Sequence, residues 1–214
     1  APYRVRLDNG EAISADAVIL TTPAFAAADL VASFQPALAA GLRQIRYVST
    51  GIVSLAYRCA DLGAALDGFG MVIPKSEGRR INALTMTSTK FEGRAPADCA
   101  LLRVFVGGSR APEAVELDDA ALLALVRAEL SDTLGIAATP LWSRIYRWPR
   151  ANPQYDVGHL DRMDALEALL PPGLYLAGGA YRGVGIPDCV RQGQDAVMKA
   201  FAYLQSRVHE TCEF

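Results

Sequence analysis

The sequence predicts a mixed α/β fold in which both ends of the chain build one domain and the middle builds another. Near each end, a short apolar strand runs into a proline or glycine turn and then a helix, at residues 17–31 and 174–208. From about residue 45 several strands follow one another, with glycine and proline turns and one long helix. We therefore expect one domain at residues 1–42 and 154–214, and an inserted mixed or antiparallel sheet crossed by a helix at 43–153.

The composition is that of an ordinary globular protein. Of its 214 residues, 51% are hydrophobic and 21% are charged, which is enough apolar material for a substantial core. The net charge of −2 indicates no nucleic-acid partner. Four scattered cysteines and two histidines argue against a metal site and favour reduced thiols in the cytoplasm. No apolar run reaches the roughly 18–20 residues of a membrane-spanning helix, although peripheral membrane contact stays open.

The first part of the chain predicts a hairpin, a strand and a helix. Residues 3–13 alternate apolar and charged side chains around Asp8-Asn9-Gly10, which is typical of a tight turn. Residues 17–20 are continuously apolar, which predicts a strand buried on both faces. The alanine-rich segment 24–31 follows Pro23 and predicts a helix.

The middle of the chain predicts a sheet and a helix. Apolar and β-branched segments indicate strands at residues 47–57, 71–73, 81–89, 101–106 and 141–148. The helix spans 117–134, since Asp118 and Asp119 suit its positive amino end and Gly135 suits its carboxyl end. Its apolar stripe recurs every four residues and consists of Leu122, Val126 and Leu130.

The last part predicts a short helix at 161–170, a strand at 174–177 and a long helix from Pro187 to about residue 208. Polar residues cover most of the long helix. Its apolar side is formed at helical spacing by Val190, Gly193, Val197, Phe201, Leu204 and Val208.

The glycine-rich turn before the long helix is the main candidate for a cofactor site. The missing side chains of Gly178, Gly179, Gly183 and Gly185 let a large flat ligand approach the backbone. Pro187 opens a helix whose free N–H groups and partial positive charge would face that ligand. A nicotinamide site is disfavoured, because an aspartate stands at the third glycine position of the dinucleotide fingerprint. Spacing alone supports a packing role for these glycines equally well.

Two further segments could lie beside the same ligand. Thr22 and Pro23 directly follow an apolar strand, and ligands of open α/β sheets bind beyond the carboxyl ends of strands. Trp148 could shield a cofactor from water, although a core position is the commoner role for such a residue. His159 is the natural acid–base candidate, but no partner is visible in the sequence, which favours a structural role. No nucleophile motif occurs, so no catalytic residue is predicted.

Four blocks of the sequence resemble the protoporphyrinogen oxidases, within the flavin amine-oxidase group, and together they cover nearly the whole chain. The first block is DAVILTTPA at residues 16–24. The second comprises GFGMVIP at 68–74, Phe91-x-x-Arg94-Ala95-Pro96 and VFVGG at 104–108. The third comprises Trp148, Pro153, Tyr155 and Gly158-His159, and the fourth is AGGAYRGVGIPDC at 177–189.

The resemblance implies a fold and an activity. The two ends would form part of a Rossmann-like FAD-binding domain, and the inserted unit would bind the substrate. The family oxidises a porphyrinogen, either protoporphyrinogen IX or coproporphyrinogen III, to the porphyrin in haem biosynthesis. Hydride equivalents pass to the flavin, which dioxygen reoxidises. Which porphyrinogen this chain serves stays open.

The resemblance also implies individual contacts. The FAD would be lined by Thr22, Pro23, Trp148, Gly178, Gly179, Val184, Gly185, Ile186 and Pro187. The tetrapyrrole would be sandwiched by Val72, Thr85 and Phe105. Its carboxylates need cations, and the arginine that the family uses for them lies outside these residues.

The chain opens on Ala1-Pro2 without Met and contains no Gly-x-Gly-x-x-Gly segment for the FAD pyrophosphate. We therefore expect a carboxyl-terminal portion of a longer enzyme, which alone holds FAD weakly or not at all and is inactive. Its partners would be the porphyrinogen, dioxygen and the missing amino-terminal part, while a homodimer stays open. Two alternatives remain: another flavin amine oxidase or a desaturase, and a non-catalytic porphyrin- or protein-binding module.

Overall fold

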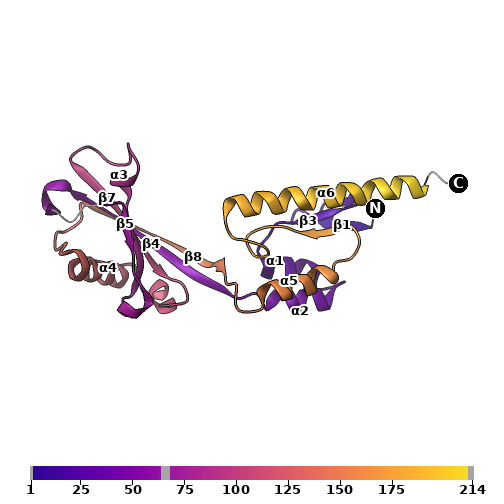
Figure 1. Ribbon diagram of the computed structural model, residues 1–214, viewed down its shortest axis with the longest axis horizontal. Coiled ribbons are helices and arrows are strands. Elements are labelled where there is room, and N and C mark those ends of the chain that lie inside the picture. Colours follow the sequence, from indigo (N-terminus) through magenta and orange to yellow (C-terminus); the bar gives the residue numbers. More distant parts are fainter. Residues whose placement is uncertain (1, 64–67, 212–214) are drawn as a thin grey trace. The chain divides into compact units, whose positions relative to one another are not determined.

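The computed structural model describes residues 2–63 and 68–211 of the chain (Figure 1). These residues divide into two compact units. The terminal unit comprises Ala1–Arg46 and Pro153–Phe214, and the central unit comprises Tyr47–Asn152. The sequence places these boundaries at 42/43 and 153/154. Cys212, which we expect to carry a reduced thiol, and the side chain of His209 lie outside the described part.

The terminal unit begins with the predicted hairpin. Strands β1 (Tyr3–Arg6) and β2 (Ala12–Ala15) pair antiparallel. Gly10 has a φ of +88°, which a residue with a side chain adopts only at a cost, and its N–H donates to the carbonyl of Leu7 at 3.0 Å. The Asp-Asn-Gly sequence therefore closes the turn as its composition predicts.

A two-stranded parallel sheet forms the centre of the terminal unit. Strands β3 (Val18–Leu20) and β9 (Leu174–Leu176) pair in register although they are far apart in sequence. The prediction that the first of these strands is buried on both faces is wrong for the described chain, because all three of its residues are only half-buried. Helices lie on both sides of this sheet, with α6 along one side and α1, α2 and α5 on the other (Figure 1).

The helices of the terminal unit partly match their predicted bounds. Helix α1 (Ala24–Val31) follows Pro23 as expected. Helix α2 (Pro36–Arg43) is not predicted, and it lies so close to α5 (His159–Ala168) that a Cβ on Gly41 would fall 2.4 Å from a methyl carbon of Leu166. Helix α5 begins two residues before its predicted start at 161.

Helix α6 (Ile186–Thr211) turns a different side to the sheet from the one its apolar stripe predicts. It contacts both β3 and β9, and its buried positions are Gln192, Ala196 and Ala200. Small alanine side chains let a helix approach a sheet closely, which explains this choice of side. The predicted stripe is more than half exposed at Val190, Val197, Phe201 and Val208.

The central unit is a five-stranded sheet in the order β5-β6-β7-β4-β8. Its strands are β4 (Tyr47–Arg58), β5 (Gly70–Val72), β6 (Ile81–Met86), β7 (Cys99–Gly107) and β8 (Trp142–Pro153). The pairs β5–β6, β6–β7 and β4–β7 are antiparallel, as expected. Strand β6 ends before its predicted limit at 89, because α3 (Thr87–Lys90) follows directly. Strand β8 runs beyond its predicted end at 148. Short 3-10 helices occupy Cys59–Asp61, Lys75–Glu77 and Pro112–Glu116.

One face of this sheet forms the core of the central unit. Helix α4 (Asp119–Leu134) buries Leu122, Val126 and Leu130 completely, as their spacing predicts. Burying one such side chain contributes about 1.5–3 kcal/mol. Asp118 caps the helix by accepting a hydrogen bond from the N–H of Ala121 at 2.8 Å, and Gly135 ends it at a φ of +67°. Alternate strand residues therefore point either into this core or away from it.

The described residues bear on membrane spans, metal ligands and disulfide bonds. No described helix is long and apolar enough to cross a membrane. The described His, Cys, Asp and Glu side chains form no group that could hold a metal ion. Cys59, Cys99 and Cys189 form no disulfide bonds.

The chain leaves and re-enters the terminal unit at one place. The N–H of Gln154 donates to the carbonyl of Arg46 at 2.8 Å. The Arg46 guanidinium also donates to both carboxylate oxygens of Asp156, at 2.7 and 3.2 Å. These hydrogen bonds lower the pKa of Asp156 below its usual value. The two connections to the central unit are therefore tied side by side.

We predict that Gly107→Ala destabilises the central unit by roughly 3 kcal/mol. Gly107 has a φ of +84°, and an added Cβ would lie 2.8 Å from the carbonyl oxygen of Ser49 and 2.2 Å from a methyl of Val115. Gly135→Ala is the matched control: its φ is also positive, but no atom lies within 4 Å of the added Cβ. We expect that control to lose only about 1 kcal/mol. Urea unfolding followed by circular dichroism measures both, and equal losses would contradict the steric explanation.

Candidate functional site

The two turns predicted to bind a cofactor lie side by side at the carboxyl ends of β3 and β9. The N–H of Ala177 donates to the carbonyl of Leu20 at 3.1 Å, which extends the parallel pairing by one step. Beyond it, Gly178 has a φ of +130°, and an added Cβ would lie 3.6 Å from the carbonyl oxygen of Thr21. The structure thereby brings the exposed residues Thr22 and Pro23 next to the glycine turn.

The glycine turn leads directly into the amino end of α6. Gly183 has a φ of +131°, and a Cβ there would lie 2.6 Å from Cβ of Asp188. A Cβ on Gly185 would lie 3.1 Å from a carboxylate oxygen of the same residue. The close turn thus requires glycine at position 183 and leaves little room at 185. The helix starts at Ile186, one residue before the predicted Pro187.

Tyr155, which precedes α5, and His159, the first residue of α5, hold the glycine turn in place. The hydroxyl of Tyr155 donates to the carbonyl of Gly179 at 2.9 Å and accepts from the N–H of Gly183 at 2.7 Å. The Tyr155 ring stacks on the imidazole of His159, with ring centroids 3.8 Å apart. His159 is buried, and its Nε2 lies 2.7 Å from the carbonyl oxygen of Tyr181. These contacts support the structural role that the sequence favours for His159.

Two further side chains fix the turn from the helices. Gln192 of α6 accepts from the N–H of Arg182 and donates to the carbonyl of Gly183, both at 3.2 Å. Arg182 donates to Glu167 at 2.7 Å and to Asp164 at 2.5 Å. These hydrogen bonds, that to Glu167 first, raise the pKa of the Arg182 guanidinium above its usual value. The backbone of the turn is therefore held in place by hydrogen bonds from several directions.

The exposed edge of the turn is apolar. Val184 and Ile186 expose 62% and 82% of their surface. The first turn of a helix also presents N–H groups without intrahelical partners and a partial positive charge. Apolar side chains beside these donors suit a flat ligand with an electron-rich edge.

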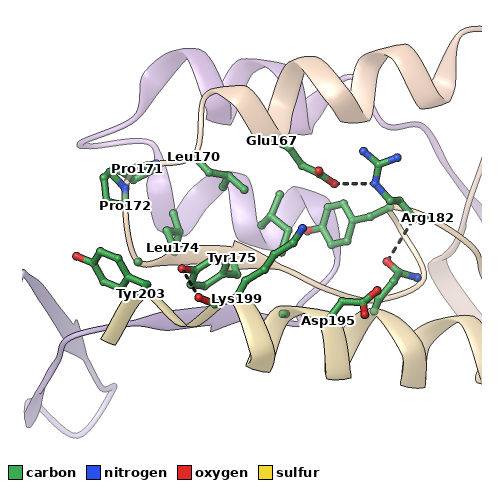
Figure 2. A pocket seen from close by; sticks show the side chains of 15 residues that line it. Glu167, Leu170, Pro171, Pro172, Leu174, Tyr175, Arg182, Asp195, Lys199 and Tyr203 are labelled. Carbon is green, nitrogen blue, oxygen red and sulfur yellow. Dashed lines mark hydrogen bonds and ion pairs between the residues drawn. The ribbon is translucent and has the colours of Figure 1, made fainter. Parts of the chain in front are cut away.

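A cavity of about 340 Å³ lies beside β9, between α5 and α6 (Figure 2). It is lined from α5, β9 and α6 by residues that include Glu167, Tyr175, Asp195, Lys199 and Tyr203. None of the residues predicted to bind FAD lines it. We therefore do not assign this cavity to the cofactor site.

The residues predicted to bind the substrate lie on three neighbouring strands of the central unit. In the strand register Val72 of β5 faces Ala83, and Ala83 faces Phe105 of β7. Thr85 of β6 faces Arg103. Their neighbours in sequence, such as Leu84 and Val104, point into the core, so the predicted three share the opposite face. The structure thus brings Val72, Thr85 and Phe105 together.

Strand β8 adds an exposed row to the same face. Ile145 packs against the core, and Arg147 donates to the carbonyls of Val115 and Leu117 on that side. The alternate residues therefore point to the uncovered face. Together, the side chains that we call the open face are Val72, Thr85, Arg103, Phe105, Trp142, Arg144, Tyr146 and Trp148.

Trp148 belongs to the central unit and not to the glycine turn. Its ring stacks on Tyr146, with centroids 5.9 Å apart, and 43% of its surface is exposed. The expectation that such a tryptophan lies in the core is wrong here. An exposed indole on the open face is available to a ligand.

Comparison with known proteins decides the family. The sequence pattern described as "Flavin containing amine oxidoreductase" matches residues 1–200. The chain belongs to the flavin-containing amine oxidoreductase family. A Bacillus subtilis relative named coproporphyrinogen III oxidase is 35% identical over 207 residues, which are 95% of this chain and 44% of the relative. The chloroplastic protoporphyrinogen oxidase of Nicotiana tabacum is 28% identical over 201 residues, 87% of this chain and 36% of that one.

A solved structure agrees with these relatives. It is that of an Exiguobacterium sp. 255-15 protein assigned to the protoporphyrinogen oxidases, with a TM-score of 0.74 and 31% identity. The match covers 95% of this chain and 44% of that one. The chain thus spans less than half the length of these members of the flavin-containing amine oxidoreductase family.

The side chains that hold the glycine turn in place are not among the predicted site residues. Tyr155 belongs to one of the quoted blocks, but nothing in its spacing reveals a contact with Gly179 or Gly183. Gln192 carries a signal, because it is a polar residue on the side of α6 that also buries Ala196 and Ala200. A polar residue on a buried side needs hydrogen-bond partners, and the nearby turn supplies them.

We predict that Tyr155→Phe loosens the glycine turn without unfolding the terminal unit. The change removes the hydroxyl that joins Gly179 to Gly183 but keeps the ring that stacks on His159. Loss of these two hydrogen bonds should speed amide exchange at residues 178–186 about tenfold. Hydrogen–deuterium exchange mass spectrometry measures this rate.

Tyr175→Phe is the control for this exchange experiment. Its hydroxyl donates to the carbonyl of Lys199 at 3.2 Å, in the same unit but outside the turn. Exchange at residues 178–186 should be unchanged in the control. Unchanged exchange in Tyr155→Phe as well would show that the hydroxyl does not hold the turn.

Proposed function

We propose that this chain is part of an FAD-dependent oxidase that converts a porphyrinogen to the porphyrin in haem biosynthesis, with dioxygen as the acceptor. The observation that carries the proposal is the glycine turn at the amino end of α6, placed beside the turn that follows β3. The porphyrinogen oxidases among its relatives support the choice of substrate class.

The turn fits a flavin ring by its shape and by its charge. Gly178 and Gly179 leave the backbone open beside Thr22 and Pro23. A flavin carries carbonyl oxygens along one edge and gains negative charge there on reduction. The amino end of α6 offers N–H donors and positive charge to such an edge. The residues that would hold the FAD are therefore Thr22, Pro23, Gly178, Gly179, Val184, Gly185, Ile186 and Pro187.

The protein's part in the reaction is to bind and to orient. When bound, FAD supplies the acceptor for hydride equivalents, and dioxygen restores it. Val184 and Ile186 would exclude water from the ring with their exposed apolar side chains. The helix amino end would stabilise the additional negative charge. This chemistry requires no nucleophile or acid–base pair from the chain, in line with the prediction of no catalytic residue.

The open face would receive the tetrapyrrole. Val72 exposes 78% of its surface, Thr85 lies on the neighbouring strand β6, and Phe105 lies on β7 beyond it. An apolar and aromatic surface suits a flat macrocycle. The central unit would thus present the substrate, and the terminal unit would hold the flavin.

The remaining contacts to FAD would come from an amino-terminal part of the same polypeptide. The 214 residues contain no Gly-x-Gly-x-x-Gly segment, which is the part of such folds that binds the pyrophosphate. We place the reaction in the cytoplasm, where the thiols of Cys59, Cys99 and Cys189 would stay reduced.

We predict that the complete polypeptide containing these residues purifies with FAD and develops porphyrin fluorescence from a porphyrinogen. The 214-residue chain alone should bind FAD at least tenfold more weakly, because the pyrophosphate contacts are absent. Flavin absorbance of both purified proteins and a fluorescence assay with each porphyrinogen measure this. A complete polypeptide with bound FAD but no porphyrin formation would refute the substrate class. Stoichiometric flavin on the short chain would refute the division of the cofactor site.

We also predict that Ile186→Glu in the complete polypeptide lowers its FAD content at least fivefold. The side chain is 82% exposed, so folding should be unaffected, while its charge would oppose the flavin at the helix amino end. Val157→Glu is the control, since Val157 is fully exposed in the same unit but outside the glycine turn. Normal FAD content in Ile186→Glu would place the flavin elsewhere.

A further inference from the structure

The strands of the central sheet carry arginines but no acidic residue. None of β4, β5, β6, β7 and β8 contains Asp or Glu. Their cations are Arg58, Arg103, Arg144, Arg147 and Arg150. Such a sheet attracts anions, and its strands offer no carboxylate with which one of their arginines could form an ion pair.

Arg147 and Arg58 are engaged in the described structure by acidic residues from outside the strands. Arg147 points to the core side and donates to Asp119 at 2.5 Å as well as to backbone carbonyls. Arg58 lies at the end of β4, 3.6 Å from a carboxylate oxygen of Asp98. Each of these two guanidinium groups therefore already has a carboxylate partner within the central unit.

Arg103 and Arg144 have a different environment. Each guanidinium lies over an aromatic ring two residues along its own strand, 5.4 Å from the centroid of Phe105 and 5.1 Å from that of Tyr146. Within the described residues neither arginine forms an ion pair. A guanidinium over a ring keeps its planar fork of N–H donors available for a carboxylate.

The position of Arg103 separates it from Arg144. Arg103 faces Thr85 in the strand register and precedes Phe105 by two residues on the same face. It therefore adjoins two of the residues that we propose to contact the tetrapyrrole. Arg144 lies on β8, which β4 separates from β7. A macrocycle seated on Thr85 and Phe105 would bring its rim to Arg103 first.

We propose that Arg103 binds the carboxylate of a propionate at one of the positions where protoporphyrinogen carries a vinyl group, and that it thereby makes the enzyme prefer coproporphyrinogen to protoporphyrinogen. Coproporphyrinogen carries propionates where protoporphyrinogen carries vinyl groups, so it offers more carboxylates to the open face. The half-buried Arg103 would lose a charge-assisted hydrogen bond with the vinyl substrate and be left desolvated without a partner. This inference rests on the proposed function and names its substrate.

The experiment uses Arg103→Gln and Arg103→Lys in the complete polypeptide, with porphyrin fluorescence as the readout. In Arg103→Gln, KM for coproporphyrinogen should rise about tenfold, while kcat and KM for protoporphyrinogen change less than about twofold. Arg103→Lys keeps the positive charge but loses the bidentate geometry of the guanidinium. Its affinity for coproporphyrinogen should therefore lie between those of the unmodified enzyme and Arg103→Gln. Flavin absorbance confirms that each variant is folded and holds its cofactor.

Arg58→Gln is the matched control, because it removes a cation from the same sheet that Asp98 already engages. It should leave both KM values unchanged. Equal changes in Arg58→Gln and Arg103→Gln would show a general charge effect and overturn the inference, as would an unchanged KM for coproporphyrinogen in Arg103→Gln. An unmodified enzyme that oxidises neither porphyrinogen would instead refute the proposed function. Soret-band titration of each variant with coproporphyrin gives a second readout that does not depend on turnover. Binding should weaken in Arg103→Gln, weaken less in Arg103→Lys and stay unchanged in Arg58→Gln.

Discussion

The parallel pairing of β3 with β9 is the constraint on which the candidate cofactor site depends. Three pairs in register, from Val18 with Leu174 to Leu20 with Leu176, join segments from opposite ends of the chain. Because parallel strands end at the same edge, the turn at Thr22 and the turn at Gly178 emerge together. A slip of one residue would turn every side chain of the strand to the opposite face and separate these turns.

The glycine turn and the open face have different physical bases. The glycine turn relies on backbone atoms, and its geometry is kept by side chains that lie behind it, such as Tyr155 and Gln192. The open face relies on side chains, and its geometry is kept by the pleat of a sheet whose other face is a packed core. In both cases, buried side chains fix the positions of the exposed atoms, and the exposed atoms remain accessible to a ligand.

Local chemistry explains which elements could be predicted from the sequence. The hairpin at Gly10 and the caps of α4 depend on neighbouring residues, so short patterns are sufficient to identify them. Helix α2 is not predicted, because proline and glycine, here Pro36 and Gly41, are typical of loops. In the structure Gly41 lies within the helix and allows its close contact with α5. The prediction of which side of α6 is buried is wrong, because hydrophobic spacing identifies an apolar side of a helix but not the surface against which the helix packs. Likewise, the glycines and the three open-face residues could be picked out by resemblance, but the roles of Tyr155 and Arg103 depend on contacts between distant segments.

The backbone hydrogen bond between Gln154 and Arg46 bears on how proteins with this two-unit arrangement can diversify. The hydrogen bond between their backbones brings the two points at which the chain leaves and re-enters the terminal unit to adjacent positions. Insertion at a point where the chain ends lie close together leaves the host fold intact. A different sheet could therefore be spliced between residues 46 and 153 while the glycine turn and the β3–β9 pair remain undisturbed. Exchange of one module at this junction would let a single flavin-binding scaffold acquire new substrates.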